Sequence, residues 1–336
     1  MNNSKLNIIY SSSVDPYFNL ALEEYLMLTK KKNEIIFYLW QNKNTVVIGH
    51  NQNPWKECNL TLAEQNHVKI ARRSSGGGAV YHDLGNLNFT FIMDNSIYNE
   101  NRQLEVILRA VNSFHLHAYF SGRNDLLLDN KKFSGNAYLY GEEISYHHGT
   151  LLVNADLQNL STYLTPSKIK IISKGITSVT SRVKNLSDSN PSITIDTLKT
   201  ALISTCEDEY GPINTISTLH QNNLQDPMFI ALFDKYTSWD FRFGKSPSFD
   251  LTLEDRFVWG EIQLHFSFQD ARISNIAIYT DALHSNFVDR LKLALIGITF
   301  NNKEIEKAMN SITWKKSETT IKDDIRSLIQ LGGSNV

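Results

Sequence analysis

The stretch ARRSSGGGAVYHD, residues 71–83, sets two arginines beside three consecutive glycines, and these residue types suit the binding of a small anion. Consecutive glycines let backbone N–H groups converge on an anion, because no side chain stands in the way. Arg72 and Arg73 add planar guanidinium groups that match the geometry of a phosphate or a carboxylate. Glycine-rich loops and solvated arginines are also common between strands. The combination nevertheless favours a loop that holds an anionic ligand.

Two further regions carry basic side chains that could face such a ligand. Lys131 and Lys132 are neighbours in the block GRNDLLLDNKKFSGNAY, and strand alternation should send them to opposite faces. Only one of them can therefore point at a given site. Residues 168–184 contain five basic side chains, whereas no acidic residue lies between Leu157 and Ser187. We expect this segment to be a mobile loop that closes over a polyphosphate, although its charge fits a solvated loop equally well.

Several common catalytic motifs are incomplete or missing. Gly244-Lys245-Ser246 resembles the end of a P-loop, but Trp239 stands where the first glycine is required. Tyr81 occupies the position of the third glycine in a dinucleotide-binding fingerprint. The sequence contains neither H-E-x-x-H nor G-x-S-x-G, so zinc hydrolysis and serine hydrolysis both lack their signatures.

The composition is that of an ordinary globular protein without a strong electrostatic field. The chain has 336 residues, of which 41% are hydrophobic and 20% charged, and its formal net charge is −2. This balance does not favour nucleic-acid binding, and no apolar run reaches the roughly 18 residues that a membrane helix needs. The two cysteines, Cys58 and Cys206, lie far apart and fit a reducing compartment. Because the chain also begins without the features of a signal peptide, we expect a cytoplasmic protein.

Capping residues and periodicity predict the elements that must position these side chains. Asp15-Pro16 is typical of a helix start and precedes YFNLALEEYLMLTK. Helices are also predicted at residues 103–119 and 194–210, where apolar residues recur at helical spacing. Strands are predicted for EIIFYLW, NTVVIGH, VKIARR, LNFTFIM, DLLLDNKKFSG and HGTLLVNA. Because strands and helices do not alternate regularly, we predict an α+β fold with a mixed or antiparallel sheet and flanking helices.

The character of the chain changes near residues 244–250, GKSPSFD, which predicts a domain boundary. Beyond it, EIQLHFSF alternates strictly and QDAR turns the chain into ISNIAIY, a pattern typical of an antiparallel hairpin. Three short helical patterns close the chain and end near Gly332. We therefore predict a catalytic domain at residues 1–245 and a small α+β accessory domain at residues 251–336.

Six longer blocks carry a family resemblance. They are LWQNKNTVVIGHNQNPWKEC, ARRSSGGGAVYHDLGN, GRNDL, KFSGNAY, HHGTLLVNADL and KGITSVTSRVKNL. In this order and spacing they resemble the bacterial lipoate–protein ligases of the lipoate/biotin ligase-like family. The region after the predicted boundary is also similar, through DRFVWGEIQLHF and YTDAL. The resemblance covers nearly the whole chain and departs in small details, with Tyr81 where phenylalanine is common and Asn136 where serine is common.

The resemblance implies an enzyme that makes lipoyl-AMP from (R)-lipoate and ATP, releases pyrophosphate, and passes the lipoyl group to a lysine of a lipoyl domain. The implied acceptors are the acyltransferase subunits of 2-oxo-acid dehydrogenases and the glycine cleavage H protein. It also implies Mg²⁺ beside the phosphates and the catalytic fold shared by biotin and lipoate ligases. Because the acceptor lysine attacks the mixed anhydride itself, we interpret Cys58 and Cys206 as packing residues. We further expect a monomer that binds neither nucleic acid nor membranes.

The same resemblance implies roles for individual residues. Lys132 is expected to bridge the lipoyl carboxylate and the α-phosphate, because the family's lysine directly precedes an x-S-G-x-A block; Lys131 then faces away. The nucleotide is expected to be held by Arg73 and by the backbone of Gly78, Ala79, Val80 and Tyr81. A wider set of binding candidates comprises Arg72, Ser74, Gly77, His82, Asn124, Asp125, His147 and Gly149. Asp125 is also the candidate contact for Mg²⁺, and no set of metal ligands is assigned.

Three alternative functions stay open. A biotin ligase would share the fold, but its glycine loop is built around alternating glycine–arginine pairs. A lipoyltransferase that takes preformed lipoyl-AMP and activates lipoate poorly would have an almost identical sequence. A non-catalytic lipoate-binding protein would not need the residues that face a polyphosphate. Release of pyrophosphate from ATP that depends on lipoate separates these functions.

Overall fold

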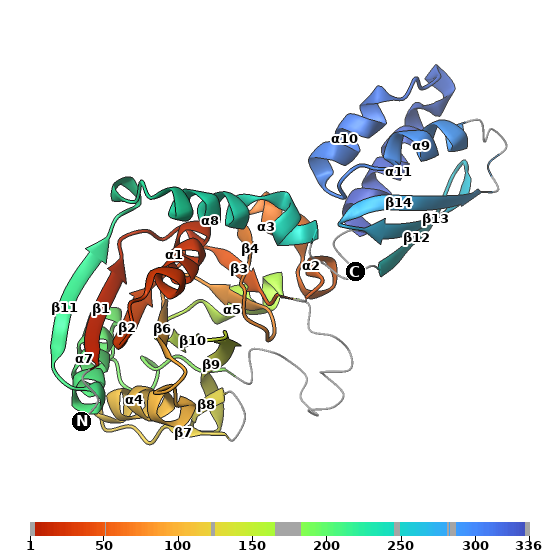
Figure 1. Cartoon of the computed structure of the whole chain (residues 1–336). Coiled ribbons are helices and arrows are strands. Elements are labelled where there is room, and N and C mark those ends of the chain that lie inside the picture. Colours follow the sequence, from red (N-terminus) through yellow and green to blue (C-terminus); the bar gives the residue numbers. More distant parts are fainter. Residues whose placement is uncertain are drawn as a thin grey trace. The chain divides into compact units, whose positions relative to one another are not determined.

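Figure 1 shows the computed structural model of the chain, which describes residues 4–50, 52–121, 125–164, 183–244, 249–280, 282 and 287–332. The chain forms two compact units. The first unit consists of Met1–His50 and Val68–Ser238, and the second unit consists of Asn51–His67 and Trp239–Val336. The predicted loop at residues 168–184 lies almost entirely outside the described residues, as do Asn124 and most of the predicted boundary. Within the described residues, no helix is both long and apolar enough to cross a bilayer.

An eight-stranded sheet forms the centre of the first unit (Figure 1). Its strand order is β11-β1-β2-β6-β10-β9-β8-β7. β1 pairs in parallel with both β11 and β2, whereas the other neighbouring strands are antiparallel. The strands are β1 (Lys5–Ser11), β2 (Glu34–Trp40), β6 (Asn86–Asp94), β7 (Tyr119–Phe120), β8 (Asp125–Leu128), β9 (Lys131–Tyr140), β10 (Ile144–Leu152) and β11 (Ile213–Leu219). This mixed sheet with flanking helices confirms the predicted α+β fold.

The block DLLLDNKKFSG, predicted as one strand, is a hairpin. β8 and β9 are joined by Asp129 and Asn130, whose φ angles of 52° and 62° lie in the left-handed region. A two-residue hairpin turn of type I′ needs this conformation at both turn positions, and Asp and Asn tolerate it better than most residues. The turn sets Lys132 opposite Leu127 at the edge of the sheet.

Helices cover both faces of the sheet. α4 (Glu100–Asn112) and α7 (Ile195–Tyr210) pack on one face over a buried core, in which the rings of Phe37 and Phe91 stack with centroids 4.4 Å apart. α1 (Pro16–Thr29) packs on the other face, where Glu23 accepts a hydrogen bond from Thr90. Further helices of this unit are α5 (Leu157–Tyr163), α8 (Pro227–Thr237) and the 3₁₀ helix η2 (Gln221–Asn223).

The helix ends follow from local hydrogen bonds. α1 begins as predicted, because the Asp15 carboxylate accepts the N–H of Tyr17 and Pro16 takes the first helical position. α4 begins before the predicted start because Asn99 caps it, and it ends well before residue 119. His115, with a φ of 59°, marks the turn that follows α4.

A small three-stranded sheet lies beside the large one and carries the glycine-rich loop. Its order is β4-β3-β5, with β3 (Thr45–Ile48) parallel to β4 (Lys69–Arg72) and antiparallel to β5 (Val80–His82). The glycines of residues 76–78 therefore fall in the connection from β4 to β5. Both ends of this connection are fixed by pairing with β3.

The second unit is an antiparallel meander with helices. Its strands are β12 (Phe249–Phe257), β13 (Gly260–Gln269) and β14 (Arg272–Thr280), and β13 and β14 confirm the predicted hairpin. The helical segments are α2 (Pro54–Glu57), α3 (Leu60–Gln65), η3 (Asp240–Gly244), α9 (Phe287–Leu295), α10 (Asn302–Ser311), η4 (Lys316–Glu318) and α11 (Thr319–Gly332). Alternate residues of β13 are buried, as the predicted amphipathic strand requires.

Residues 51–67, which connect β3 to β4, belong to the second unit. Trp55 of α2 is fully buried there, and its indole stacks on the ring of Phe268 and packs against that of Phe243. A short segment from the first part of the sequence thus completes the core of a unit that is otherwise built from the last part.

We expect Trp55→Ala to lower the free energy of unfolding of the second unit by about 3–5 kcal/mol, the usual cost of removing a buried aromatic side chain. Urea unfolding followed by circular dichroism measures this change. The control is Leu293→Ala in α9, whose side chain is 79% exposed and whose loss should change the stability by less than about 0.5 kcal/mol. Equal effects of the two substitutions would contradict this account of the core.

Candidate active site

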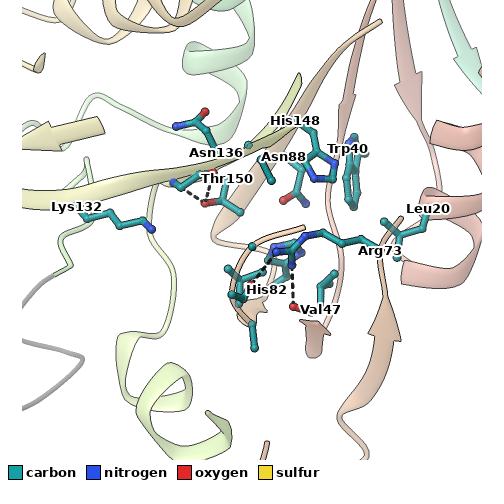
Figure 2. Close-up of a pocket in the computed structure, with 17 residues that line it drawn as sticks. Leu20, Trp40, Val47, Arg73, His82, Asn88, Lys132, Asn136, His148 and Thr150 are labelled. Atoms are coloured by element: carbon teal, nitrogen blue, oxygen red, sulfur yellow. Dashed lines mark hydrogen bonds between the residues drawn. The ribbon is translucent and has the colours of Figure 1, made fainter. Parts of the chain in front are cut away.

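A pocket in the first unit gathers residues from both sheets, from α1 and from the glycine-rich loop (Figure 2). It is lined by Leu20, Trp40, Val47, Arg73, Gly77, Gly78, Ala79, Val80, His82, Asn88, Lys132, Gly135, Asn136, Ala137, His148, Gly149 and Thr150. In Figure 2, Lys132 lies on one side of the pocket, and Trp40 and Leu20 lie on the other. The Lys132 ammonium therefore lies at one end of the pocket, and the large apolar side chains of Trp40 and Leu20 lie at the other.

Arg73 is the residue around which the glycine-rich loop folds. Its guanidinium donates to the carbonyl oxygens of Gly76 (2.7 Å), Gly78 (2.8 Å) and Val47 (3.2 Å), and its Nε donates to Ser75 Oγ (3.1 Å). The side chain is buried, and this burial lowers the pKa of Arg73 to about 10, so the group stays charged at neutral pH. The loop carbonyls thus point at the buried cation.

Gly77 is the glycine that this arrangement requires. Its φ is 94°, and a Cβ atom at this position would lie 2.8 Å from Arg73 Nη2. A side chain would therefore meet both backbone strain and the guanidinium. The chain can wrap around Arg73 at this point because glycine has no side chain.

Arg72 and Ser74, two of the predicted candidates, lie outside the pocket lining. Arg72 is fully buried and donates to the carbonyl oxygens of Gly49 (3.2 Å) and His50 (2.7 Å). Ser74 Oγ lies 2.8 Å from the hydroxyl of Tyr236 in α8. Tyr81 is also buried beside the pocket and absent from its lining. These side chains anchor the loop from behind, whereas Gly77, Gly78, Ala79 and Val80 face the pocket.

Lys132 and Lys131 take opposite directions, as strand alternation predicts. Lys132 lines the pocket, and its Nζ lies 2.7 Å from Asp125 Oδ1. Lys131 is exposed and absent from the lining. Gly135 makes room for the lysine, because a Cβ atom there would come 2.8 Å from Lys132 Nζ. Asp125, the candidate metal contact, is paired with this ammonium group.

Two adjacent histidines on β10 face opposite sides of the large sheet. His148 lines the pocket, with Nδ1 2.9 Å from Glu23 Oε1 and Nε2 2.7 Å from Ser75 Oγ. His147 instead lies on the face that α4 covers, 3.0 Å from Gln103 Oε1 and 2.8 Å from Asn136 Oδ1. The structure thus puts His148 in the pocket lining in place of the predicted His147.

His82, one of the binding candidates, lies in the pocket lining and is almost completely buried. Burial, together with the nearby Arg73 charge, lowers the pKa of His82 to about 3. Burial also lowers the pKa of His147 to about 3, with a smaller contribution from His148. His82 and His147 are therefore neutral imidazoles at physiological pH.

Sequence patterns did not predict the apolar wall of the pocket. Leu20 comes from α1, Trp40 ends β2 and Val47 lies in β3. The polar side chain of Asn88, in β6, belongs to the residue paired with Trp40. No local motif joins these residues, and each looks like an ordinary core position in its own segment. Only the pairing of the strands brings them to one place. Gly149 was predicted and does line the pocket.

Comparison with protein families gives two matches along the chain. The lipoyl protein ligase A/B catalytic domain matches residues 15–207, and the bacterial lipoate protein ligase C-terminus matches residues 246–331. A lipoate–protein ligase A of Blochmanniella floridana is 42% identical over 324 residues, which cover 93% of this chain and 94% of the relative. A lipoate–protein ligase A of Psychrobacter cryohalolentis is 39% identical over 314 residues, which cover 92% of this chain and 93% of the relative.

Solved structures give the same family. A crystal structure of P. falciparum LipL1 in complex with lipoate is 32% identical, with a TM-score of 0.64, and the match covers 97% of this chain and 99% of that one. A bipartite lipoate protein ligase from Thermoplasma acidophilum, described with its E2 lipoyl domain, is 25% identical with a TM-score of 0.63. That match covers 72% of this chain and 97% of the archaeal one.

The two neutral histidines should make the stability of the first unit depend on pH. Their pKa rises from about 3 in the folded chain to about 6.5 in the unfolded chain, so the unfolded chain binds more protons below pH 6.5. Stability is therefore lost as pH falls, by about 2 kcal/mol per pH unit between about pH 6 and pH 5 for the pair.

Urea unfolding at a series of pH values measures this slope. His82→Phe should remove about half of the pair's contribution to it. The matched control is His117→Phe, because His117 is exposed and lies outside the pocket. A slope that is the same in His82→Phe and in the unsubstituted protein would count against a neutral, buried His82.

Proposed function

This chain belongs to the family of lipoate–protein ligases, which are enzymes, and from that premise we propose that it activates lipoate with ATP and attaches the lipoyl group to lipoyl-domain lysines. The observation that carries the proposal is the pocket, which joins a glycine-rich loop, Lys132 and an apolar wall. The lipoate bound to LipL1 and the lipoyl domain described with the archaeal ligase support the same substrate and the same class of acceptor.

The pocket lining spans four neighbouring strands of the large sheet, and we propose that the acyl chain lies across them. The lining runs from β9, which carries Lys132, across β10 and β6 to Trp40 at the end of β2. Adjacent strands lie about 4.8 Å apart, so three spacings give roughly 14 Å. This length suits an extended acyl chain of eight carbons that ends in a small ring. We therefore assign the carboxylate end to Lys132 and the distal end to Trp40.

The first step joins two groups of like charge. A carboxylate and an α-phosphate about 4 Å apart repel by roughly 4 kcal/mol at an effective dielectric constant near 20. In our proposal the Lys132 ammonium lies between them and opposes this repulsion, while the loop N–H groups from Gly77 to Val80 face the phosphate. A carboxylate oxygen bonds to the α-phosphorus, and the bond from that phosphorus to pyrophosphate breaks.

The second step needs no covalent group from the enzyme. The amine of the acceptor lysine attacks the carbonyl carbon of lipoyl-AMP, an amide forms, and AMP leaves. AMP is a far better leaving group than the oxide that a free carboxylate would have to release. Cys58 and Cys206 are both buried and lie outside the pocket lining, which supports our interpretation of them as packing residues.

We propose that Mg²⁺ binds together with ATP. The described residues contain no cluster of three side chains that could hold a metal ion, so we assign the ion mainly to the phosphate oxygens, with Asp125 beside them. Bound there, Mg²⁺ would neutralise phosphate charge. Our expectation of a cytoplasmic monomer stays a prediction, and two reduced, buried cysteines are compatible with a reducing compartment.

The function is tested by release of pyrophosphate from ATP and by mass spectrometry of an added lipoyl domain. We expect release only when lipoate or a similar medium-chain acid is present, followed by a mass increase of one lipoyl group on one lysine. Lipoyl transfer from added lipoyl-AMP without release from ATP would identify a lipoyltransferase. Release driven by biotin and not by lipoate would refute the assignment.

The paired lysines give a sharper test of the site. Lys132→Ala should lower the rate of adenylation by about 10²–10³-fold, because removing a cation from developing charge typically costs roughly 3–4 kcal/mol. Lys131→Ala is the matched control, since it removes the same side chain from the exposed face of β9 and should change the rate little. Single-turnover formation of lipoyl-AMP measures both. An inactive Lys131→Ala variant together with an active Lys132→Ala variant would refute the catalytic role that we assign to Lys132.

A further inference from the structure

The second unit carries a groove of its own, which the proposed function does not use. Every residue that lines this groove belongs either to β12 or to α11, so a strand and a helix form its two walls. Its volume of about 420 Å³ falls within the range of roughly 300–1,000 Å³ that is usual for clefts that bind ligands. A cleft of this size between a strand and a helix can hold a short stretch of polypeptide.

The wall formed by β12 is the edge of the strand. Four consecutive residues, 252–255, line the groove. Successive side chains of a strand point to opposite faces of the sheet, so a groove over one face would meet only alternate residues. Among the described strands, β12 pairs only with β13 and is the outer strand of its sheet (Figure 1). The groove therefore runs along an edge whose backbone N–H and C=O groups face no neighbouring strand.

The wall formed by α11 is one stripe of the helix. Asp324, Ser327, Leu328 and Leu331 line the groove, and their spacing of i, i+3, i+4 and i+7 puts them on a single face. The three isoleucines of α11 that are buried lie on a neighbouring face. Leu331 is 64% exposed, so the stripe includes a large apolar side chain that the described residues leave uncovered.

The groove has an apolar end and an acidic end. A Cβ atom on Gly332 would clash with the Leu253 side chain, so the end of α11 lies against the middle of β12. The Asp324 carboxylate accepts the indole N–H of Trp259 (2.8 Å), which directly follows the end of β12. The helix therefore runs antiparallel to the strand. Leu253 and Leu331 lie at one end of the groove, and Asp324 lies towards the other.

The groove contains three carboxylates, those of Glu254, Asp255 and Asp324. Within the described part of the second unit, none of them forms an ion pair with a lysine or an arginine, and the nearby Arg256 pairs with Glu261 (3.1 Å). Carboxylates without cations favour a cationic occupant. A second copy of this chain would add further carboxylates to the same groove, and the repulsion between like charges disfavours it.

We propose that this groove binds an extended, basic segment of a partner protein, which adds to β12 as a further strand. Lysine or arginine side chains of the segment face Asp255 and Asp324, and an apolar side chain lies between Leu253 and Leu331. Main-chain hydrogen bonds to an exposed edge give such a complex its affinity, and the side chains give it specificity.

The length of the segment follows from the strand. Leu253 and Phe257 are four residues apart and span roughly 14 Å at the usual rise of a strand, so a segment of five to seven residues fills the groove. The inference does not depend on the proposed function, because the second unit holds none of the residues that line the pocket.

The test measures binding of a fluorescein-labelled peptide of seven alternating leucines and lysines to the full chain by fluorescence anisotropy. The same peptide with glutamate in place of lysine should bind at least about 10-fold more weakly. Two further peptides carry N-methyl groups on one or the other set of alternate backbone amides. Only one set faces β12 in an added strand, so one methylated peptide should lose about 10-fold or more in affinity and the other should lose little.

Substitutions at exposed positions locate the peptide on the protein. Asp255→Asn should weaken binding about 2- to 5-fold, and Leu331→Ala about 3- to 10-fold. The matched controls are Glu306→Gln in α10 and Leu293→Ala in α9, which make similar changes at exposed positions outside the groove and should leave the affinity as it is. Thermal unfolding followed by circular dichroism should be the same for all four variants.

Four outcomes overturn the proposal. They are no binding of the leucine–lysine peptide up to about 1 mM, equal binding of its glutamate counterpart, equal losses for the two methylated peptides, and unchanged affinity in both Asp255→Asn and Leu331→Ala. The first outcome would assign the carboxylates to the protection of an edge strand against aggregation. Dimers in analytical ultracentrifugation that Leu331→Ala dissociates would instead identify a second copy as the occupant. Losses confined to one methylated peptide and to the two groove variants support the proposal.

Discussion

The contact between one buried guanidinium and the carbonyl groups of its own loop underlies the rest of the site. Arg73 binds the oxygens of Gly76 and Gly78, and the strands on either side pair with β3. A loop of glycines would otherwise sample many conformations, because glycine loses more backbone freedom on folding than any other residue. The cation compensates for this by holding the carbonyls behind the loop. The N–H groups of the same loop are those that our proposal assigns to the phosphate.

The two faces of the large sheet have different roles: one packs against helices, and the other lines the pocket. On one face, the His147 side chain lies close to Gln103 of α4 and to the side-chain oxygen of Asn136. On the other face, His148 and Thr150 line the pocket. Because neighbouring residues alternate between the faces, one strand can supply both the core and the ligand site. As a consequence, a shift of one residue in the pairing of a strand would move its core-facing side chains to the pocket face and its pocket-facing side chains to the core.

The sequence predicted features that are local and contiguous. The glycine-rich loop, the paired lysines and the N-cap at Asp15 each occupy a short block, and the structure has each where it was expected. It did not predict the choice of His148 over His147, because a face is set by the pairing of β10 with its neighbours. The turn at Asp129 and Asn130 did leave a signal, since these two residues favour the left-handed conformation that a tight hairpin requires. The apolar wall of the pocket left no such signal in the sequence.

The segment at residues 51–67 has a consequence for the order in which the chain can fold during synthesis. It leaves the ribosome long before β12, β13 and α11, with which it shares a compact unit. Proteins generally fold domain by domain as they emerge, so the large sheet of the first unit can assemble while Trp55 still lacks Phe268. An aromatic side chain that becomes fully buried therefore stays exposed until translation is almost complete.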